Sequence, residues 1–275
     1  MINYNQQLIP RQQVSLKISN RAFKYGDAVF ETLKVQNSKI IFSEEHYFRL
    51  MSSMRMLRMK IPMFASLEFF EDQILRTIVE NSLQDARVRF SVFRKDGGLY
   101  LPKDNEVDFL IEVHPLNVET KESYRVDLFK DFEVSSSVLS TIKTVSKTIN
   151  VLASIFAHEN NLDNCILLNE KKNIVGVTNA NIFLIKGKTV YTPSIDQGCL
   201  KGIVRNKIIE LIKKDVNYTC TETNISPFEL LKADEVFLTN SIIGIQNVTQ
   251  YRKKSYATEL TLALKGKLKI LETLI

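Results

Sequence analysis

Residues 138–157 read VLSTIKTVSKTINVLASIFA and join an apolar run to a patterned helix through a polar link. The apolar run, Val138–Ile142, predicts a β-strand. Beyond the link, apolar residues recur at the spacing that puts them on one face of a helix: Ile149, Leu152, Ala153, Phe156 and Ala157. A strand leading directly into an amphipathic helix indicates a fold that mixes α and β elements.

The same mixture extends through the chain on both sides of this stretch. Before it, alternating apolar residues predict strands, and helical spacing predicts two helices: strands at 29–35, 40–42, 87–93 and 106–113, and helices at 46–59 (with Ser43 as N-cap) and 66–82. Around and after it we expect further strands and helices: strands at 125–134, 165–168, 182–185, 189–191 and 235–238, and helices at 204–214, 227–231 and 258–274. The expected fold class is therefore α+β, with both element types in each half.

A polar stretch without period separates the two halves. It runs from Pro115 to Ser123 and carries no strand or helix pattern. The sequence therefore predicts a smaller N-terminal α/β domain at 1–114, a connector at 115–123 and a larger C-terminal α/β domain at 124–275. At 275 residues, the chain has the length of two ordinary domains.

The composition argues against a membrane-spanning, secreted or metal-binding protein. There is no apolar run of about 18 residues that would cross a membrane, and the N-terminal segment lacks the apolar core of a secretory signal. The three cysteines are far apart in sequence, which favours reduced thiols over disulfides or a zinc site, and we expect a cytoplasmic protein. With three histidines, a histidine-rich metal centre is not expected.

The net charge of +6 raises the question of nucleic-acid binding. The basic residues are scattered, however, and no zinc finger, RNP motif or Gly-rich RNA loop is present. The charge fits a basic solvated surface, and it would also suit a protein that holds a phosphate cofactor and carboxylate substrates. We therefore expect a small-molecule partner and no nucleic acid.

Two lysines in the polar link could carry chemistry. Lys143 and Lys147 lie among small polar residues, between the expected strand and the expected helix. A lysine that points into a cleft at a strand end loses its proton more easily, as Schiff-base chemistry requires. The alternative is that both are solvated, as most lysines are.

A backbone phosphate site is possible at Gln197–Arg205. This segment contains Gly202 and runs into an amphipathic helix, whose first amides attract anions. Most helix starts of this kind bind only water, so both interpretations stay open. Asn179, Asn181 and Asn240 flank apolar strand-like runs, where they could either close turns or line a polar pocket.

Ordered blocks over some 230 residues carry a resemblance to a known family. They are NRAFKYGDAVFET at 20–32, His46-x-x-Arg49-Leu50, the Arg94 strand end, LASIFAHENNLDNCILLNE, NANIFLIKG, YTP, CLKGIVR and ADEVFLTNSIIGIQNV. Together they resemble the class IV (fold type IV) pyridoxal phosphate (PLP) enzymes. That family includes branched-chain and D-amino-acid aminotransferases and aminodeoxychorismate lyase, and it implies a two-domain fold.

The resemblance also implies roles for single residues. Lys143 matches the lysine that bonds PLP, with Lys147 as the second choice. The family's phosphate contacts match Arg49, Gly202, Ile203, Val204, Asn240 and Ser241. Its substrate pocket matches Tyr25, Phe30, Thr32 and Lys34, with Arg94 placed where some relatives bind the substrate carboxylate, often across a homodimer interface.

The chain departs from the family pattern at one position. Relatives place a glutamate five residues before the asparagine of the N-x-F segment, where it holds the pyridine nitrogen protonated. Counted back from Asn181, that position is Gly176, with Val175 and Val177 on either side. The tyrosine that some relatives place near the phenolic oxygen of the cofactor is not evident either.

These residues leave three functions open. The first is transamination between a small amino acid and a 2-oxo acid. The second is aminodeoxychorismate lyase activity, which releases pyruvate and p-aminobenzoate and depends less on the missing glutamate. The third is a catalytically impaired homologue that keeps the fold. If catalysis persists, water or a polar group such as Asn179 could fill the place of the glutamate, or the reaction could need little ring protonation.

Overall fold

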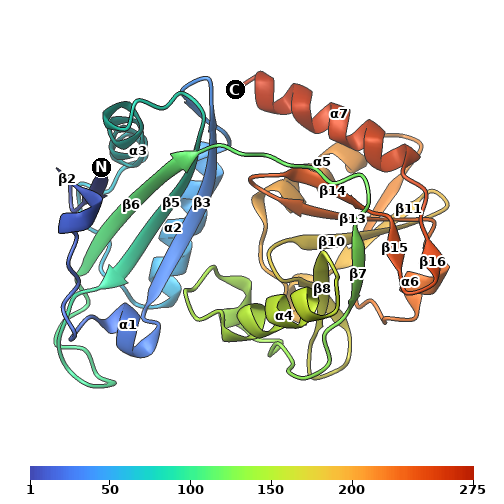
Figure 1. Cartoon of the computed structure of the whole chain (residues 1–275), viewed down its shortest axis with the longest axis horizontal. Coiled ribbons are helices and arrows are strands. Elements are labelled where there is room, and N and C mark those ends of the chain that lie inside the picture. The colour runs from blue at the N-terminus through green and yellow to red at the C-terminus, as the bar shows by residue number, and fades with distance from the viewer. The chain divides into compact units, whose positions relative to one another are not determined.

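The computed structural model describes residues 1–275, and the chain separates into two units with cores of their own (Figure 1). Unit 1 comprises 1–117, 143–146 and residue 275, and unit 2 comprises 118–142 and 147–274. The division expected from the sequence is contiguous and assigns 143–146 to the second domain. In the structure these four residues lie with unit 1.

Unit 1 is built on one six-stranded antiparallel sheet, in the order β2-β1-β6-β5-β3-β4. Its strands are β1 (Ile2–Tyr4), β2 (Gln7–Ile9), β3 (Ala28–Gln36), β4 (Lys39–Ile40), β5 (Ala86–Arg94) and β6 (Val107–Pro115). Its helices are the short η1 (Arg11–Gln13), α1 (Arg21–Tyr25), α2 (Ser43–Met56) and α3 (Leu67–Glu80).

Strand β3 shows how the sequence places this core. Its residues alternate between the two faces of the sheet, so Val29, Leu33 and Val35 share one face. All three are buried and join one cluster with apolar residues of α2 and α3, including Leu50 and Ile74. The intervening residues face the other way, and that alternation puts different chemistry on the two sides of β3.

The two long helices of unit 1 begin differently. The Ser66 hydroxyl accepts a hydrogen bond from the Phe69 amide at 3.2 Å and caps α3. The expected cap at Ser43 is wrong, because Ser43 is the first helical residue of α2. The residue before it, Phe42, has a left-handed backbone (φ 57°) and makes no side-chain cap bond.

Unit 2 contains two five-stranded sheets, in the orders β12-β11-β10-β13-β14 and β16-β15-β7-β8-β9. Its strands are β7 (Arg125–Leu128), β8 (Asn164–Leu168), β9 (Ile174–Val177), β10 (Asn181–Lys186), β11 (Thr189–Pro193), β12 (Thr219–Thr223), β13 (Glu235–Asn240), β14 (Gly244–Val248), β15 (Gln250–Tyr251) and β16 (Lys254–Ser255). Its helices are η2 (Val138–Thr141), α4 (Thr148–Glu159), η3 (Ile195–Gln197), α5 (Ile203–Lys213), α6 (Glu229–Lys232) and α7 (Glu259–Thr273).

The strand expected at Val138–Ile142 is wrong, since Val138–Thr141 form the 3₁₀ helix η2. Local side-chain bonds explain the difference. The Ser140 hydroxyl donates to the Ser135 carbonyl, and the Thr141 hydroxyl donates to the Val138 carbonyl at 2.7 Å. Hydroxyls that bond their own backbone offer it an alternative to a sheet ladder.

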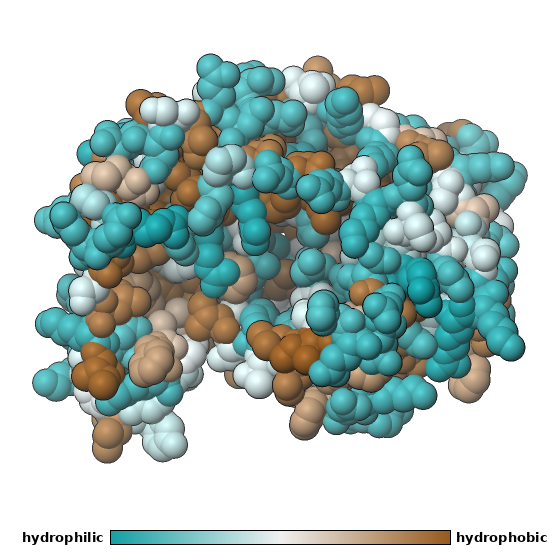
Figure 2. Space-filling view, viewed as in Figure 1, coloured by the Kyte–Doolittle hydropathy of each residue, from teal (hydrophilic) through white to brown (hydrophobic).

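The helical face expected after the polar link is confirmed. Ala153 and Ala157 of α4 are buried, and the other apolar residues of that face pack against the same cluster: Ile149, Leu152 and Phe156. None of the helices has the length and apolar character needed to cross a bilayer. Figure 2 shows hydrophilic residues over much of one face, with apolar residues gathered in smaller groups between them.

Candidate active site

Lys143 is held against an edge of β3 by its backbone. The Phe30 amide donates to the Lys143 carbonyl at 2.9 Å, and the Val145 amide donates to the Ala28 carbonyl at 3.1 Å. Thr144, between them, pairs with Val29 as an antiparallel bridge. The stretch 143–146 therefore adds a short strand-like segment to the sheet of unit 1.

The Lys143 amine lies beside an aromatic ring. Its Nζ is 4.5 Å from the centroid of the Phe30 ring, and the Arg89 guanidinium carbon is 3.8 Å from the same centroid. Both are cation–π distances. Lys143 as a whole residue is half-buried.

Glu31, which follows Phe30 on β3, lies at the centre of a buried ionic cluster. The Glu31 carboxylate accepts hydrogen bonds from Arg49 Nε at 2.8 Å, from Arg49 Nη2 at 2.5 Å and from His46 Nδ1 at 2.7 Å. The Glu31 and His46 side chains are 1% and 0% exposed, and that of Arg49 is 11% exposed. Glu31, His46 and Arg49 are hereafter called the β3–α2 cluster.

Electrostatics fix the charge states of this cluster. Burial alone would raise the pKa of Glu31, but the Arg49 guanidinium and the His46 hydrogen bond lower it to about 2, so the carboxylate is ionised. Burial lowers the pKa of His46 and outweighs the carboxylate beside it. A neutral His46 that donates from Nδ1 carries no proton on Nε2, and Nε2 is buried without a hydrogen-bond partner.

The backbone at Gly202 is closely packed against the Asn181 side chain. A Cβ at Gly202 would lie 2.0 Å from Asn181 Oδ1, so a side chain there would displace Asn181. The Asn181 amide in turn donates to the Leu200 carbonyl at 2.9 Å. Helix α5 begins immediately afterwards with Ile203 and Val204, whose amides have no acceptor within the helix.

Asn240 closes the turn between β13 and β14. Its side-chain oxygen accepts from the amides of Ile242 and Ile243 at 3.0 and 2.8 Å. Its amide nitrogen donates to the Asn179 carbonyl at 3.4 Å. The turn-closing interpretation of Asn240 is thus confirmed, and a phosphate contact from Asn240 or the adjacent Ser241 remains a prediction.

The expected substrate residues lie on β3 and α1. Phe30, Thr32 and Lys34 alternate along β3 and so share the face opposite to Glu31, and Lys34 is 6% exposed. Tyr25 ends α1, with its ring 5.7 Å from that of Tyr100. The structure therefore gathers three of the four residues on one sheet face.

Arg94 is extensively bonded inside unit 1. Its Nε donates to Asp27 at 2.9 Å, Nη1 to Asn105 Oδ1 at 2.5 Å, and Nη2 to the Leu57 carbonyl at 2.7 Å. The residue is 6% exposed. Its role toward a substrate carboxylate remains a prediction, and that role would require some of these bonds to break.

Lys147 and Gly176 both lie in unit 2. Lys147 precedes the first residue of α4, and burial lowers its pKa. Gly176 lies in β9 opposite Leu167, where a Cβ would be 3.0 Å from the Ala180 carbonyl oxygen. Asn179 is exposed and its Oδ1 accepts from Asn164 at 3.0 Å.

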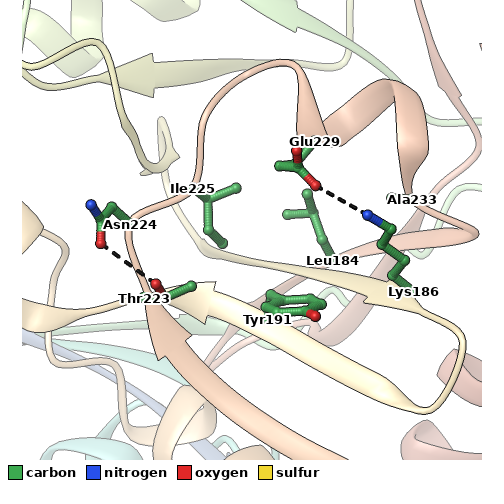
Figure 3. A pocket seen from close by; sticks show the side chains of 8 residues that line it. All are labelled: Leu184, Lys186, Tyr191, Thr223, Asn224, Ile225, Glu229 and Ala233. Atoms are coloured by element: carbon green, nitrogen blue, oxygen red, sulfur yellow. Dashed lines mark hydrogen bonds and ion pairs between the residues drawn. The ribbon is translucent and has the colours of Figure 1, made fainter.

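Unit 2 also contains a cavity of about 180 Å³ between β10, β11 and the segment that leads into α6 (Figure 3). Leu184 and Ile225 are among the residues that line it, and two further lining residues, Lys186 and Glu229, form an ion pair with each other at 3.4 Å. None of the site residues predicted from the sequence lines it. The cavity is therefore separate from the predicted site residues.

Sequence reasoning did not assign a role to Glu31, His46 or Arg205. Arg205 of α5 is 2% exposed and donates to Glu222 at 2.7 Å and to the Pro193 carbonyl at 2.9 Å. For Glu31 a signal was present. It occupies the same alternation phase of β3 as Val29 and the other core residues, which marks an acid on a buried face.

Comparison with known proteins shows which family this chain resembles. The family model for class IV amino-transferases matches residues 28–251. A curated relative named "Putative branched-chain-amino-acid aminotransferase", from Methanocaldococcus jannaschii, is 29% identical over 282 residues, covering 99% of this chain and 96% of its own.

Solved structures share the fold. The branched-chain aminotransferase of Thermoproteus uzoniensis, solved with norvaline, has a TM-score of 0.90 at 19% identity, covering 98% of this chain and 93% of its own. A "Putative 4-amino-4-deoxychorismate lyase" of Legionella pneumophila has a TM-score of 0.85 at 22% identity, covering 94% and 96%. The predicted α+β, fold type IV architecture is confirmed by these likenesses. Because the family model spans most of its length, the chain belongs to the class IV aminotransferase family of enzymes.

Proposed function

We propose that this enzyme uses PLP to move an amino group from a small amino acid to a 2-oxo acid, with Lys143 as the lysine that bonds the cofactor. The observation that carries the proposal is the position of Lys143. Its backbone is bonded to β3 and its amine lies over the Phe30 ring. Phe30 is followed on β3 by Glu31, which binds Arg49.

The residues present fit most of such a cofactor. Arg49 provides a planar cation for a phosphate, and the glycine at 202 leaves the first amides of α5 unobstructed by a side chain of its own. They do not supply a carboxylate for the ring nitrogen at residue 176. When bound, PLP supplies an electron-withdrawing ring and an aldehyde for the lysine.

The protein's own residues then have defined tasks. With PLP in place, Lys143 would hold its aldehyde, and the Lys143 Nζ, once free of it, would serve as the general base for the α-proton of the substrate and then as the general acid. Phe30, Thr32 and Lys34 line the substrate, and Arg94 binds its carboxylate. We propose a homodimer and a cytoplasmic location as parts of the same function.

Borohydride trapping tests the lysine. The protein is incubated with PLP, reduced and digested, and the pyridoxyl mass should appear on the peptide that carries Lys143. Lys143→Ala should abolish it, and Lys147→Ala should retain it. A label on Lys147 would move the assignment to that residue, and no label on either would overturn PLP dependence.

The lyase is the second candidate function, and the glycine at 176 favours it. Release of pyruvate from aminodeoxychorismate forms an aromatic product, so it depends less on ring protonation than transamination does. Assays of both reactions decide: turnover of amino and 2-oxo acids without any p-aminobenzoate excludes the lyase. A protein that traps PLP and performs neither reaction is the catalytically impaired homologue.

Gly176→Glu tests the missing carboxylate, with Gly176→Ala as its control. Alanine reports the cost of a Cβ 3.0 Å from the Ala180 carbonyl, and glutamate adds the carboxylate. We expect the glutamate variant to bind PLP more tightly or transaminate faster than the alanine variant. Equal behaviour of the two would show that residue 176 does not face the ring nitrogen.

A further inference from the structure

Two neighbouring residues of β3 each hold one of the cations that the proposed function assigns to the cofactor. The Phe30 amide donates a hydrogen bond to the Lys143 carbonyl, and the Phe30 ring contacts the Lys143 amine. Glu31, which points to the opposite face of the strand, binds the Arg49 guanidinium through two nitrogens. The relative placement of the two cations is therefore fixed within unit 1 by a single dipeptide.

The β3–α2 cluster has the geometry of an orienting device. Two parallel hydrogen bonds from Arg49 to one carboxylate fix both the position and the plane of the guanidinium. His46 donates to the same carboxylate at 2.7 Å and so restrains Glu31 itself. All three side chains are nearly or fully removed from water, so these bonds are not screened.

The charges argue that the cluster is not a simple attractor for anions. Glu31 is ionised and burial keeps His46 neutral, so Glu31 offsets the charge of Arg49. If attraction alone mattered, a carboxylate 2.5 Å from the guanidinium would be unfavourable to an anion nearby. The benefit of Glu31 must therefore come from the orientation that it gives to the Arg49 guanidinium.

We propose that Glu31 and His46 are positioning residues that orient Arg49 to receive a phosphate monoester. This rests on the proposed function, in which the phosphate belongs to PLP. Glu31 sets the plane of the guanidinium and His46 holds the carboxylate from the other side. Neither residue contacts the phosphate.

The experiment compares two aldehydes that differ only in the phosphate: PLP and pyridoxal. Dissociation constants for both are measured by absorbance titration, with borohydride trapping as the check of attachment to Lys143. The ratio of the two constants isolates the phosphate contribution, because fold, lysine and ring contacts are common to both. Thermal unfolding of each variant gives its stability separately.

Two substitutions at Glu31 separate direction from charge. Glu31→Asp keeps the charge but withdraws the carboxylate by one methylene, and Glu31→Gln keeps the length but removes the charge. Orientation predicts that both lower the preference for PLP over pyridoxal by about tenfold or more, the size expected for charge-assisted hydrogen bonds. A Gln variant that prefers PLP more strongly than wild type would overturn the proposal in favour of charge.

His46 is tested by rescue. His46→Asn retains an N–H that can donate to Glu31 and should keep most of the PLP preference. His46→Leu removes the donor and should lose it. Equal loss in both, or in neither, contradicts a role for the hydrogen bond.

Glu235→Gln is the matched control. Glu235 is a second buried carboxylate, at the first position of β13 in unit 2, and it accepts three hydrogen bonds from residues at the start of α7. It should lose stability with an unchanged PLP-to-pyridoxal ratio. If Glu31 variants bind both aldehydes equally less well, Glu31 is merely structural, whereas a wild-type protein that traps neither aldehyde contradicts the proposed function itself.

Discussion

At the scale of single residues, two glycines have opposite tolerance for a side chain. A Cβ at Gly202 would lie 2.0 Å from Asn181 Oδ1, whereas one at Gly266, within α7, would meet nothing within 4 Å. Both have ordinary backbone angles, so only space distinguishes them.

We expect Gly202→Ala to lower the free energy of unfolding by roughly 1–3 kcal/mol, the usual cost of overpacking. Gly266→Ala should raise it by up to about 1 kcal/mol, because alanine is the better helix former. Urea denaturation of the two variants measures both. Equal effects would mean that Asn181 moves aside without cost.

His46 makes stability depend on pH in a defined direction. Its pKa in the folded chain is below the ordinary value of 6.5 because it is buried, so the unfolded chain binds more protons as the pH falls. Stability is therefore fully present above 6.5 and is lost below it. Glu31, whose pKa falls from 4.5 to about 2, adds a further loss below 4.5.

The prediction is that the free energy of unfolding decreases between pH 7 and pH 5.5, and that His46→Asn reduces this slope. The exposed His158→Asn variant should leave the slope as in wild type. Urea denaturation at the two pH values provides the measurement. An unchanged slope in His46→Asn would mean that other groups cause the loss.

The sequence supports only part of the site at this scale. Lys143 and Arg49 could be proposed as site residues from motifs, because each matches one position of a family pattern. The bonds that hold them could not, since Glu31 and Arg49 are 18 positions apart in the sequence and meet only after a turn and a helix have formed. A buried ion pair leaves no local spacing in the sequence to detect.

At the scale of elements, α7 takes its N-terminal cap from a distant strand. The Glu235 carboxylate accepts from the amides of Leu260 and Thr261 at 2.8 and 2.9 Å and from the Thr261 hydroxyl at 2.6 Å. Thr258, the residue in the cap position, makes no side-chain cap bond. The helix start therefore depends on tertiary structure.

We expect Glu235→Gln to cost about 1–3 kcal/mol, the range for hydrogen bonds to a charged group, and Thr258→Ala to cost less than about 0.5 kcal/mol. Thermal unfolding of the pair of variants compares them directly. A larger loss of stability in Thr258→Ala than in Glu235→Gln would show that Thr258, and not Glu235, caps α7.

Long periodic elements were predictable and short ones were not. The helices near 66–82 and 258–274 appear as α3 and α7, because their apolar faces repeat over several turns. At 138–142, side-chain hydroxyls favoured a 3₁₀ turn over the strand that the apolar residues indicated. Strands β9 and β14 were not predicted, since four or five residues carry too few repeats.

At the scale of the whole molecule, the chain leaves unit 2 for only four residues, 143–146, to pair with β3. No pattern in the sequence indicates such an excursion, because a short polar link has the same composition wherever it lies. A fragment comprising 1–117 would therefore have an incomplete sheet edge at Ala28–Phe30.

Hydrogen exchange should detect this edge. In the full chain the Phe30 amide donates to the Lys143 carbonyl and should exchange slowly. In the fragment 1–117 it should exchange much faster, while the Phe90 amide, on the inner strand β5, remains protected. Equal protection of Phe30 in both would mean that the fragment supplies another partner.

The same excursion restricts how the protein could be recombined with its relatives. A chimera spliced at residue 117 would pair the sheet of one parent with the residue-143 lysine and flanking backbone of the other parent. A chimera that exchanges the whole of unit 1 must therefore also replace residues 143–146 as a separate insert. The lysine then comes from the same parent as the sheet that it borders.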